Sequence, residues 1–481
     1  MIMLAGATLV AGCGTTQPII APSNPLKQLQ HSIDMLLADS TFESTHACIK
    51  VVSLGNGRIL YDHDSKALMN PASNIKLITA AAALSVLDTG YLFTTSVFAD
   101  TLSGDGTVAR TLYLKGYGNP DLTTSDLDTL ALIVRRSGVT TILKNIIIDD
   151  SYFDDSYWGD GWSWDDAGDP DAPSINALSV NKNCITVTIT ADARSTSIAL
   201  NPATDFITVF NKTTVVSDTI RTPLRLRRFA NATVNTLLVE GEMFGKSQTT
   251  KKIALCNPSY YAGALFKESL QRAGIAIRGT VTSGTIPDGI HEIARQSQPI
   301  GKVISTMNKQ SDNLSAENLL KVMGARQYNL PGSAKNGIAV EKKFLAGLGM
   351  DTTKFVLADG SGVSRYNLLS ADELVQFLAA MKKQTRLFPM FYQSLPAAGL
   401  DGTLEYRMTD LPAVANLRAK TGTLNGTSCL SGYVTTRDGD MLAFSILMQH
   451  FIYPTSDYHL VQDKIGSLLA GFTWKTSSFQ K

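Results

Sequence analysis

Residues 71–84 read PASNIKLITAAAAL, a short polar head followed by an almost wholly apolar run. The segment from Asn74 to Leu87 is rich in Ala and Leu and predicts a helix that residues 88–90 end. Ser73 and Lys76 are three residues apart and therefore share one face of that helix. A lysine amine can activate a serine hydroxyl when burial or nearby positive charge lowers its pKa. The alternative is an unrelated pair of surface side chains, but the apolar run indicates a buried helix.

A second polar motif, Ser-Asp-Asn at residues 311–313, stands just before a helix predicted from Ser315. From such a loop the Ser311 hydroxyl and the Asn313 amide can relay protons and hold a substrate amide. Helix capping is the alternative interpretation, because Ser, Asp and Asn cap helices in proteins of every kind.

A third motif, KTGT, lies in the run 416–424, which predicts a strand. Lys420 and Thr421 can present a cation and a hydroxyl to a substrate carboxylate, and Gly422 can let a substrate backbone approach closely. The Thr423 N–H can complete an oxyanion hole with the N–H of the serine. The alternative is an edge strand with a solvated lysine. Each motif is a weak signal alone, but all three in this order are typical of penicillin-interacting serine acyltransferases.

The composition narrows the class of protein. The 481 residues are 44% hydrophobic and 18% charged, so a sizeable core is available. Lys and Arg number 43 against 42 Asp and Glu, which leaves no basic excess for nucleic acid. No apolar run reaches the roughly 18 residues of a spanning helix, which excludes an integral membrane protein.

The order of predicted elements indicates one α/β domain in two segments of the chain. Helices and strands mix in residues 26–91 and 297–481, whereas residues 92–296 are strand-rich with a few short helices. We therefore expect residues 92–296 to be an inserted region of one or two mostly β domains.

Further stretches resemble the penicillin-binding protein 4 type of D-alanyl-D-alanine carboxypeptidase/endopeptidase, a low-molecular-mass class C family. Besides residues 71–84, they are GYGNPDL at 116–122, ALSVN at 177–181, DGSGVSRYN at 359–367 and GLDGTL at 399–404. The likeness runs from about residue 25 to 475. It implies a discontinuous transpeptidase/β-lactamase-like domain, an antiparallel sheet flanked by helices, that carries two inserted, mostly β domains.

The resemblance also implies an activity and roles for the site residues. The substrates would be peptidoglycan stem peptides, the inhibitors β-lactam antibiotics, and no cofactor or metal would be needed. The roles are as follows: Ser73 is acylated; Lys76 is the general base; Ser311 and Asn313 shuttle protons and hold the substrate; Lys420, Thr421 and Thr423 bind the terminal carboxylate and the oxyanion; Asp149 and Arg365 lie near the free amino end of the peptide.

The N-terminus predicts export. Residues 1–12 are almost wholly apolar and end in Val-Ala-Gly before Cys13, which resembles a bacterial lipobox, although no Lys or Arg precedes the apolar segment. We expect residues 1–13 to be a lipoprotein signal, residues 14–25 to be a tether, and Cys13 to carry lipid in the periplasm or cell envelope. A disordered apolar N-terminus is the alternative.

Other features leave alternatives open. Residues 149–171 hold nine Asp and three Trp, which indicates a solvated acidic loop, a binding surface for sugar or peptide, or a calcium loop.

The four cysteines after Cys13 show no metal-ligand spacing, and free thiols are slightly favoured over disulfides. A β-lactamase is disfavoured because no E-x-x-L-N string occurs. A non-catalytic envelope protein that binds peptidoglycan or a partner is the other alternative.

Overall fold

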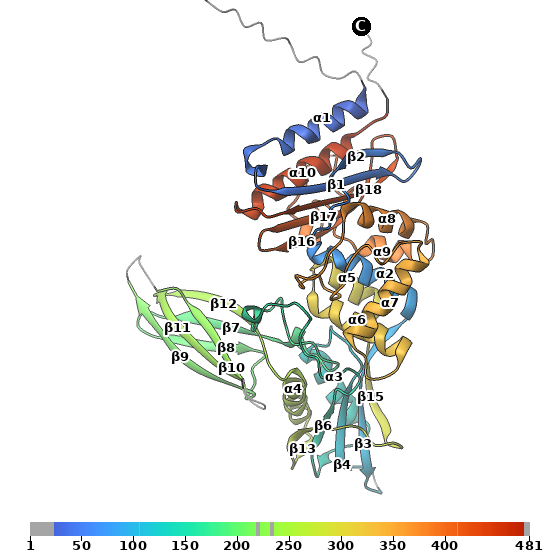
Figure 1. Ribbon diagram of the computed structural model, residues 1–481. Helices are drawn as coiled ribbons and strands as arrows, with labels where there is room; N and C mark the ends of the chain where they lie inside the picture. The colour runs from blue at the N-terminus through green and yellow to red at the C-terminus, as the bar shows by residue number, and fades with distance from the viewer. Residues whose placement is uncertain (1–23, 105, 218–221, 231–234, 411, 476–481) are drawn as a thin grey trace, which may run out of the picture.

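The structure is a computed structural model that describes residues 24–104, 106–217, 222–230, 235–410 and 412–475. The predicted signal segment, Cys13 and nearly all of the tether lie outside the described residues. Figure 1 shows a sheet between helices at one end, a group of helices in the middle, and a strand-rich region that divides into two arms. Both ends of the described chain lie at the sheet end of the molecule (Figure 1).

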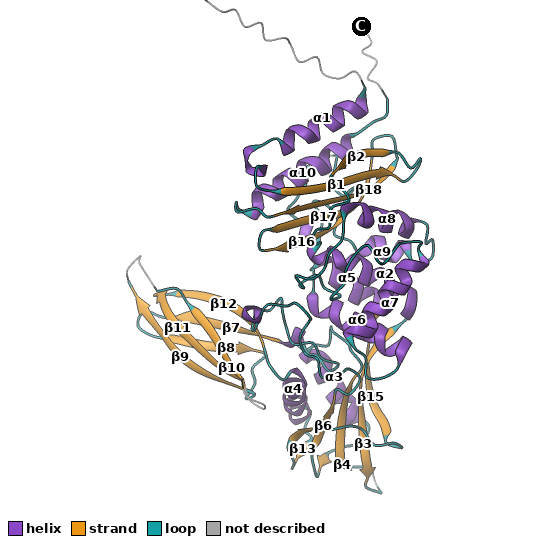
Figure 2. Ribbon diagram, in the orientation of Figure 1, coloured by secondary structure: helices purple, strands orange, loops and turns teal. Residues whose placement is uncertain are grey.

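A five-stranded antiparallel sheet joins the two ends of the chain, because Ile49 pairs with Ile446 across neighbouring strands. In order across the sheet, the strands are β16 (Arg418–Leu424), β17 (Thr427–Thr435), β18 (Met441–Gln449), β1 (His46–Ser53) and β2 (Ile59–His63). The helices α1 (Pro25–Leu37) and α10 (Thr455–Gly471) pack on one face and α8 (Ala371–Lys382) on the other (Figure 2). Because helices cover both faces, β17 is a nearly continuous buried run.

A central helix, α2 (Ile75–Leu87), is buried at every residue from Ile75 to Leu84. Its apolar, Ala-rich sequence suits a helix that other helices surround on all sides. Those helices are α5 (Ile300–Lys309), α6 (Asn313–Tyr328), α7 (Ala334–Gly347) and α9 (Phe388–Ser394). The prediction of a buried helix at this position is therefore confirmed.

The inserted region begins with a seven-stranded mixed sheet. It contains β3 (Leu92–Leu102), β4 (Val108–Gly116), β5 (Thr141–Ile142), β6 (Ile146–Asp149), β13 (Ala276–Ile277), β14 (Val281–Ser283) and β15 (His291–Pro299). Two helices, α3 (Thr124–Arg136) and α4 (Pro258–Arg272), pack against each other and against this sheet. A capping box at Thr123 and Asp126 fixes the start of α3.

The second arm consists of two three-stranded sheets that lie between β6 and α4 in the sequence. One is β12 (Ser247–Ala254), β7 (Cys184–Ala191) and β8 (Thr196–Asn201); the other is β10 (Arg225–Ala230), β11 (Asn235–Phe244) and β9 (Ile207–Val216). The domain boundaries at residues 91/92 and 296/297 remain predictions. No helix in the described part of the chain is long and apolar enough to cross a membrane.

Candidate active site

Ser73 lies in a one-turn 3-10 helix, η2 (Ala72–Asn74), directly before α2, and not in the α-helix itself. Ala72 adopts a left-handed conformation with φ 46°, which is unusual for a residue with a side chain. The backbone of Gly362 lies so close that a Cβ there would stand 1.9 Å from the Ala72 carbonyl oxygen. The serine is therefore held on a tightly packed turn, half-buried at the head of the central helix.

Lys76 is fully buried one turn after Ser73. Its Nζ lies 2.9 Å from Ser73 Oγ, 2.5 Å from Asn313 Oδ1 and 2.6 Å from the Ser361 carbonyl oxygen. Burial lowers the pKa of Lys76 to about 8, although the charges of Asp359 and other carboxylates oppose the shift. An amine in contact with a serine hydroxyl, and with a pKa near neutrality, is suited to act as a general base.

A buried carboxyl group, Glu317, stands behind this lysine. Its Oε1 accepts hydrogen bonds from the backbone N–H groups of Gly360 and Ser361, and the carbonyl of Ser361 contacts Lys76. Burial, and then the charge of Asp359, raise the pKa of Glu317 to about 8. Glu317 is therefore largely protonated at neutral pH and supplies little negative charge to the lysine.

The Ser311–Asn313 motif enters the site as the N-terminus of α6, which begins at Asn313, two residues earlier than predicted. Ser311 has φ 58°, and its Oγ lies 3.0 Å from the Nζ of Lys420. Asp312 is the N-cap of the helix and accepts from the Ser315 N–H at 2.7 Å. Helix capping and contact with Lys76 and Lys420 are thus both present in one loop, because each of the three side chains points to a different partner.

Lys420 is fully buried although β16 is an edge strand of the sheet. Its Nζ also donates to the Thr421 carbonyl oxygen at 2.8 Å, and burial together with Lys76 holds the pKa of Lys420 well below its usual range. The Thr421 hydroxyl is fixed by a 2.7 Å hydrogen bond to Thr403. The alternative of a solvated lysine on an edge strand is therefore wrong.

Gly422 plays a different part from the one we expected. A Cβ at this position would stand 2.7 Å from the Asn74 amide nitrogen and 3.0 Å from the Pro71 carbonyl oxygen. The close approach that the glycine permits is therefore to the turn that carries Ser73, and not to a substrate backbone. Gly422 lets β16 pack against that turn.

These elements surround a cavity of about 430 Å³. Eleven lining residues come from the transpeptidase-like part and lie within, or next to, the stretches quoted above: Ser73, Gln310, Ser311, Asn313, Val363, Arg365, Thr403, Thr421, Thr423, Leu424 and Asn425. The other four lining residues are Asp166, Asp169, Asp171 and Ala172. Residues separated by hundreds of positions thus meet at one groove.

Asp149 does not join this cavity. Its fully buried carboxylate pairs with Lys115 at 3.1 Å and accepts from the Ser151 hydroxyl and the Ile286 N–H. Burial alone would raise the pKa of Asp149, but these three donors outweigh it and lower the pKa. We conclude that Asp149 ties strands together, because its acceptor sites are already occupied away from the groove.

The acidic side of the cavity comes from residues 166–171, which belong to the Asp-rich stretch 149–171 but were not named as site residues from the sequence. Asp166, Asp169 and Asp171 line the groove, and the Asp171 carbonyl accepts from the Asn313 amide at 2.6 Å. The segment is anchored by Trp162, whose indole N–H donates to Asp359 at 3.0 Å. The density of Asp in this stretch was a signal, but only long-range packing shows which of them face the serine.

The described residues contain no group of His, Cys, Asp and Glu side chains that is suited to hold a metal ion. Cys48, Cys184, Cys256 and Cys429 are free, which agrees with the expectation of thiols rather than disulfides.

Comparisons with known proteins agree with this geometry. A family model described as the D-Ala-D-Ala carboxypeptidase 3 (S13) family matches residues 29–470. The D-alanyl-D-alanine carboxypeptidase of Actinomadura sp. (strain R39) is 33% identical over 469 residues, which cover 93% of this chain and 85% of the relative. The crystal structure of penicillin binding protein 4 from Haemophilus influenzae has a TM-score of 0.83 at 24% identity and covers 92% of this chain and 99% of its own. A structure of that protein with a novel β-lactam has a TM-score of 0.77 at the same identity, and covers 92% of this chain and all of its own.

The structural similarity confirms the predicted fold, a discontinuous transpeptidase-like domain with inserted β domains. The family match covers the serine, both lysines and the whole inserted region. The chain therefore belongs to the D-Ala-D-Ala carboxypeptidase 3 (S13) family, a family of serine peptidases.

Proposed function

We propose that the protein is a serine DD-peptidase of peptidoglycan and that Ser73 is its nucleophile. Ser73 Oγ attacks the carbonyl carbon of the penultimate D-Ala while the neutral Lys76 amine takes the hydroxyl proton. The terminal D-Ala leaves as its amine after it receives a proton, and water then hydrolyses the acyl-enzyme. On a cross-bridge between two stem peptides the same steps amount to endopeptidase activity.

The observation that carries this proposal is the 2.9 Å contact between Ser73 Oγ and the buried Lys76 Nζ. With a pKa of about 8, roughly a tenth of Lys76 is unprotonated at pH 7. At the ordinary lysine pKa of 10.5 the unprotonated fraction would be only about one in 3,000. Burial of the lysine therefore supports a base that works at neutral pH.

We propose that the other motif residues bind the substrate as follows. Lys420 and the Thr421 hydroxyl receive the terminal carboxylate, and the N–H groups of Ser73 and Thr423 stabilise the oxyanion. Ser311 passes the proton toward the leaving amine, since its hydroxyl lies 3.0 Å from Lys420. Asn313 holds the Lys76 amine, and its own amide is held by the Asp171 carbonyl.

We further propose that Arg365 lies near the free amino end of the bound peptide, because it lines the cavity beside the catalytic groups. In place of Asp149, we assign the acidic contribution on this side to Asp166, Asp169 and Asp171, which line the same cavity. β-Lactams are the expected inhibitors, and a solved H. influenzae relative is described in complex with one.

We also propose that the protein acts in the periplasm or cell envelope and that a lipid on Cys13 is its only membrane anchor. The lipobox-like residues 10–13 and the polar segment after them support this proposal. Metabolic labelling with a tagged fatty acid tests it, and Cys13→Ser should carry no label.

The test of the activity compares the wild type, Ser73→Ala and a control, Ser85→Ala, which changes an exposed serine on the same helix. Fluorescent penicillin should label the wild type and Ser85→Ala covalently and leave Ser73→Ala unlabelled. Mass spectrometry should show release of D-Ala from a pentapeptide by the first two proteins only. Equal labelling of all three proteins would disprove the assignment of Ser73. A wild type that binds muropeptides without cleaving them would favour the non-catalytic alternative, and rapid nitrocefin turnover would favour a β-lactamase.

A further inference from the structure

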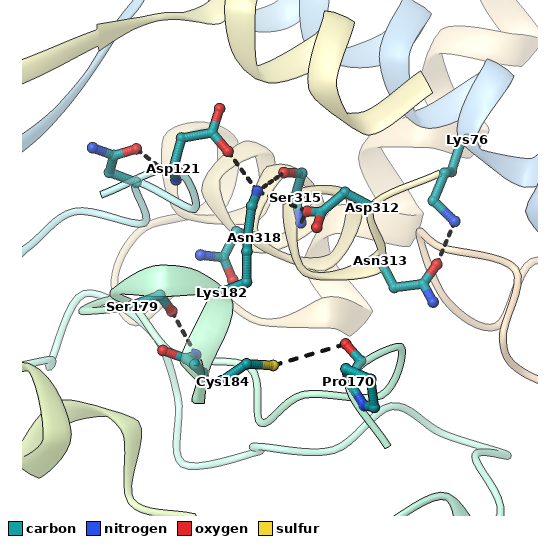
Figure 3. Close-up of polar contacts among 12 residues, drawn as sticks. Lys76, Asp121, Pro170, Ser179, Lys182, Cys184, Asp312, Asn313, Ser315 and Asn318 are labelled. Atoms are coloured by element: carbon teal, nitrogen blue, oxygen red, sulfur yellow. Dashed lines mark hydrogen bonds and ion pairs between the residues drawn. The ribbon is translucent and has the colours of Figure 1, made fainter. Parts of the chain in front are cut away.

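One lysine of the inserted region reaches the active-site loop from behind. Lys182 precedes β7, in the short turn η4 (Asn181–Asn183), and its Nζ contacts three side chains. It lies 2.5 Å from Asp121 Oδ1, 3.0 Å from Asp312 Oδ1 and 3.0 Å from Ser315 Oγ. Figure 3 shows these contacts beside the pair formed by Lys76 and Asn313. An ammonium group has three protons, so this side chain is saturated.

The partner at the centre of this contact is the middle residue of the 311–313 loop. Asp312 is flanked by Ser311, which contacts Lys420, and by Asn313, which contacts Lys76. Because Ser311 has a left-handed backbone, the loop needs support from its surroundings. Asp312 provides it from the side opposite the groove, through the helix N–H of Ser315 and the ammonium of Lys182.

The turn that carries Lys182 is itself held in an unfavourable conformation. Asn181, Lys182 and Asn183 all have positive φ, between 51° and 60°. Asn181 and Asn183 are fixed by side-chain hydrogen bonds to Thr124 and Ser174. A non-glycine left-handed residue costs conformational energy, so the fold maintains this turn at a cost. The conformation directs the lysine toward α6.

The two carboxylates that contact Lys182 favour its charged ammonium form. Burial alone would lower the pKa of Lys182, but Asp312 and Asp121 outweigh burial and raise it. Burial alone would raise the pKa of Asp312, but Lys182 and the hydrogen bonds from Ser315 together outweigh burial and lower it. Asp121 is oriented by the Asn119 amide oxygen, which accepts from the Asp121 N–H at 3.0 Å. The cation is thus shared between a carboxylate of the inserted region and one of the active-site loop.

Contacts of the same kind continue along α6. Four of its residues or cap residues, three positions apart, form one face that meets the inserted region: Asp312, Ser315, Asn318 and Lys321. Asn318 donates to the Gly118 and Asn176 carbonyls, and Lys321 pairs with Asp154 at 2.6 Å. We call these four residues the seam. Only its first member adjoins the side chains that contact Lys76 and Lys420.

We infer that Lys182 is a positioning residue of the active site, which holds the 311–313 loop in place through Asp312. A residue of the inserted region would then help to position the groups that take part in the reaction. The inference rests on the proposed function, since it assumes that Ser311 and Asn313 serve the reaction of Ser73. Removal of the Lys182 charge should lower the rate of acylation, because the 311–313 loop carries the groups that we propose for proton transfer.

The test uses Lys182→Met, which keeps the length of the side chain and removes its charge. A matched control is Lys321→Met, which removes a buried seam lysine of α6 that lies about two turns from the loop. We expect Lys182→Met to lower kcat for D-Ala release and the penicillin acylation rate roughly 10- to 100-fold, with KM nearly unchanged. Lys321→Met should retain kcat within about threefold per folded molecule.

The double variant Lys182→Met/Asp121→Asn separates positioning from stability. It removes one of the two carboxylates that the single variant leaves without their cation, so the thermal unfolding midpoint should partly recover. The acylation rate should stay low, because Asp312 still lacks the lysine. Recovery of both quantities, or an unchanged kcat in Lys182→Met, would overturn the inference. A wild type without Ser73 acylation would instead refute the proposed function, and that measurement is made first.

Discussion

Three buried lysines, Lys76, Lys420 and Lys321, and the half-buried Lys182 form two pairs with opposite surroundings. In the catalytic groove, Lys76 and Lys420 donate only to uncharged oxygens, those of hydroxyl, amide and carbonyl groups. At the seam, Lys182 and Lys321 each pair with carboxylates. The pKa is lowered for both groove lysines and raised for Lys182. Burial alone therefore does not decide the protonation of a lysine; the partner that accompanies burial does.

The pKa values of Lys76 and Lys420 stay low although acidic residues lie near the groove. Glu317 is the buried carboxyl group behind Lys76, and a pKa of about 8 keeps it largely protonated at neutral pH. Asp359 accepts from the N–H groups of Gly362 and Ser364 and from the Asn367 amide, so several donors share its charge. Glu317 is thus largely uncharged at neutral pH, and the charge of Asp359 is stabilised by hydrogen bonds from the protein.

The largest effect should come from removing the base. We expect Lys76→Met to lower Ser73 acylation at least 1,000-fold and yet to raise the free energy of unfolding at pH 7. The pKa of Lys76 falls from 10.5 in the unfolded chain to about 8, so its protonation in the folded state costs about 3 kcal/mol below pH 8. This cost disappears as the pH rises from about 8 to 10.5. Denaturant unfolding measures it, and Lys321→Met, which leaves Asp154 unpaired, should show the opposite sign.

A smaller effect should follow from Lys420→Met. We expect roughly a 100-fold fall in kcat/KM for a peptide that ends in a free D-Ala carboxylate, because the carboxylate supplies the countercharge that Lys420 lacks. The same variant should lose much less activity on a peptide whose terminal carboxylate is an amide. Equal losses of kcat/KM on both peptides would mean that Lys420 does not bind the terminal carboxylate.

The smallest effect is the response of the wild type to a change of one pH unit. Only the unprotonated Lys76 can accept the serine proton, so the acylation rate should fall about tenfold per pH unit below about pH 8 and level off above it. Stopped-flow measurement of acylation by a fluorescent penicillin between pH 5 and 9 gives the dependence of this rate on pH. A rate that is constant over this range would place the base elsewhere.

Local sequence patterns accounted for the elements with strong periodicity. The Ala-rich run of α2 was predicted as a buried helix, and this is confirmed. The strand β8 gives only a weak signal, because it alternates between half-buried and exposed residues. Helix α5 gives a stronger signal, since Ile300, Val303, Ile304 and Met307 recur at helical spacing and all are buried.

The site was predicted where chemistry is local and missed where it depends on packing. Ser73 and Lys76 are neighbours on one turn, so their contact follows from their spacing. Asp149 was assigned from a short match to the family, and nothing in the local sequence tells that Asp166, Asp169 and Asp171 line the groove. Gly422 was assigned to the substrate, because the turn at Pro71 that fills the space lies 351 positions away.

By itself, the sequence predicted the serine and lysine that we propose as nucleophile and base, and it determined the order of the three motifs, since these depend on residue type and on spacing within single elements. The tertiary structure alone decided the direction in which the pKa values of Lys76, Lys420 and Lys182 shift, and it alone brought residues of the inserted region to the cavity. A pKa depends on burial and on neighbouring charges, and a loop conformation depends on its supports. Both are supplied here by residues more than 100 positions away, as when Lys182 meets Asp312.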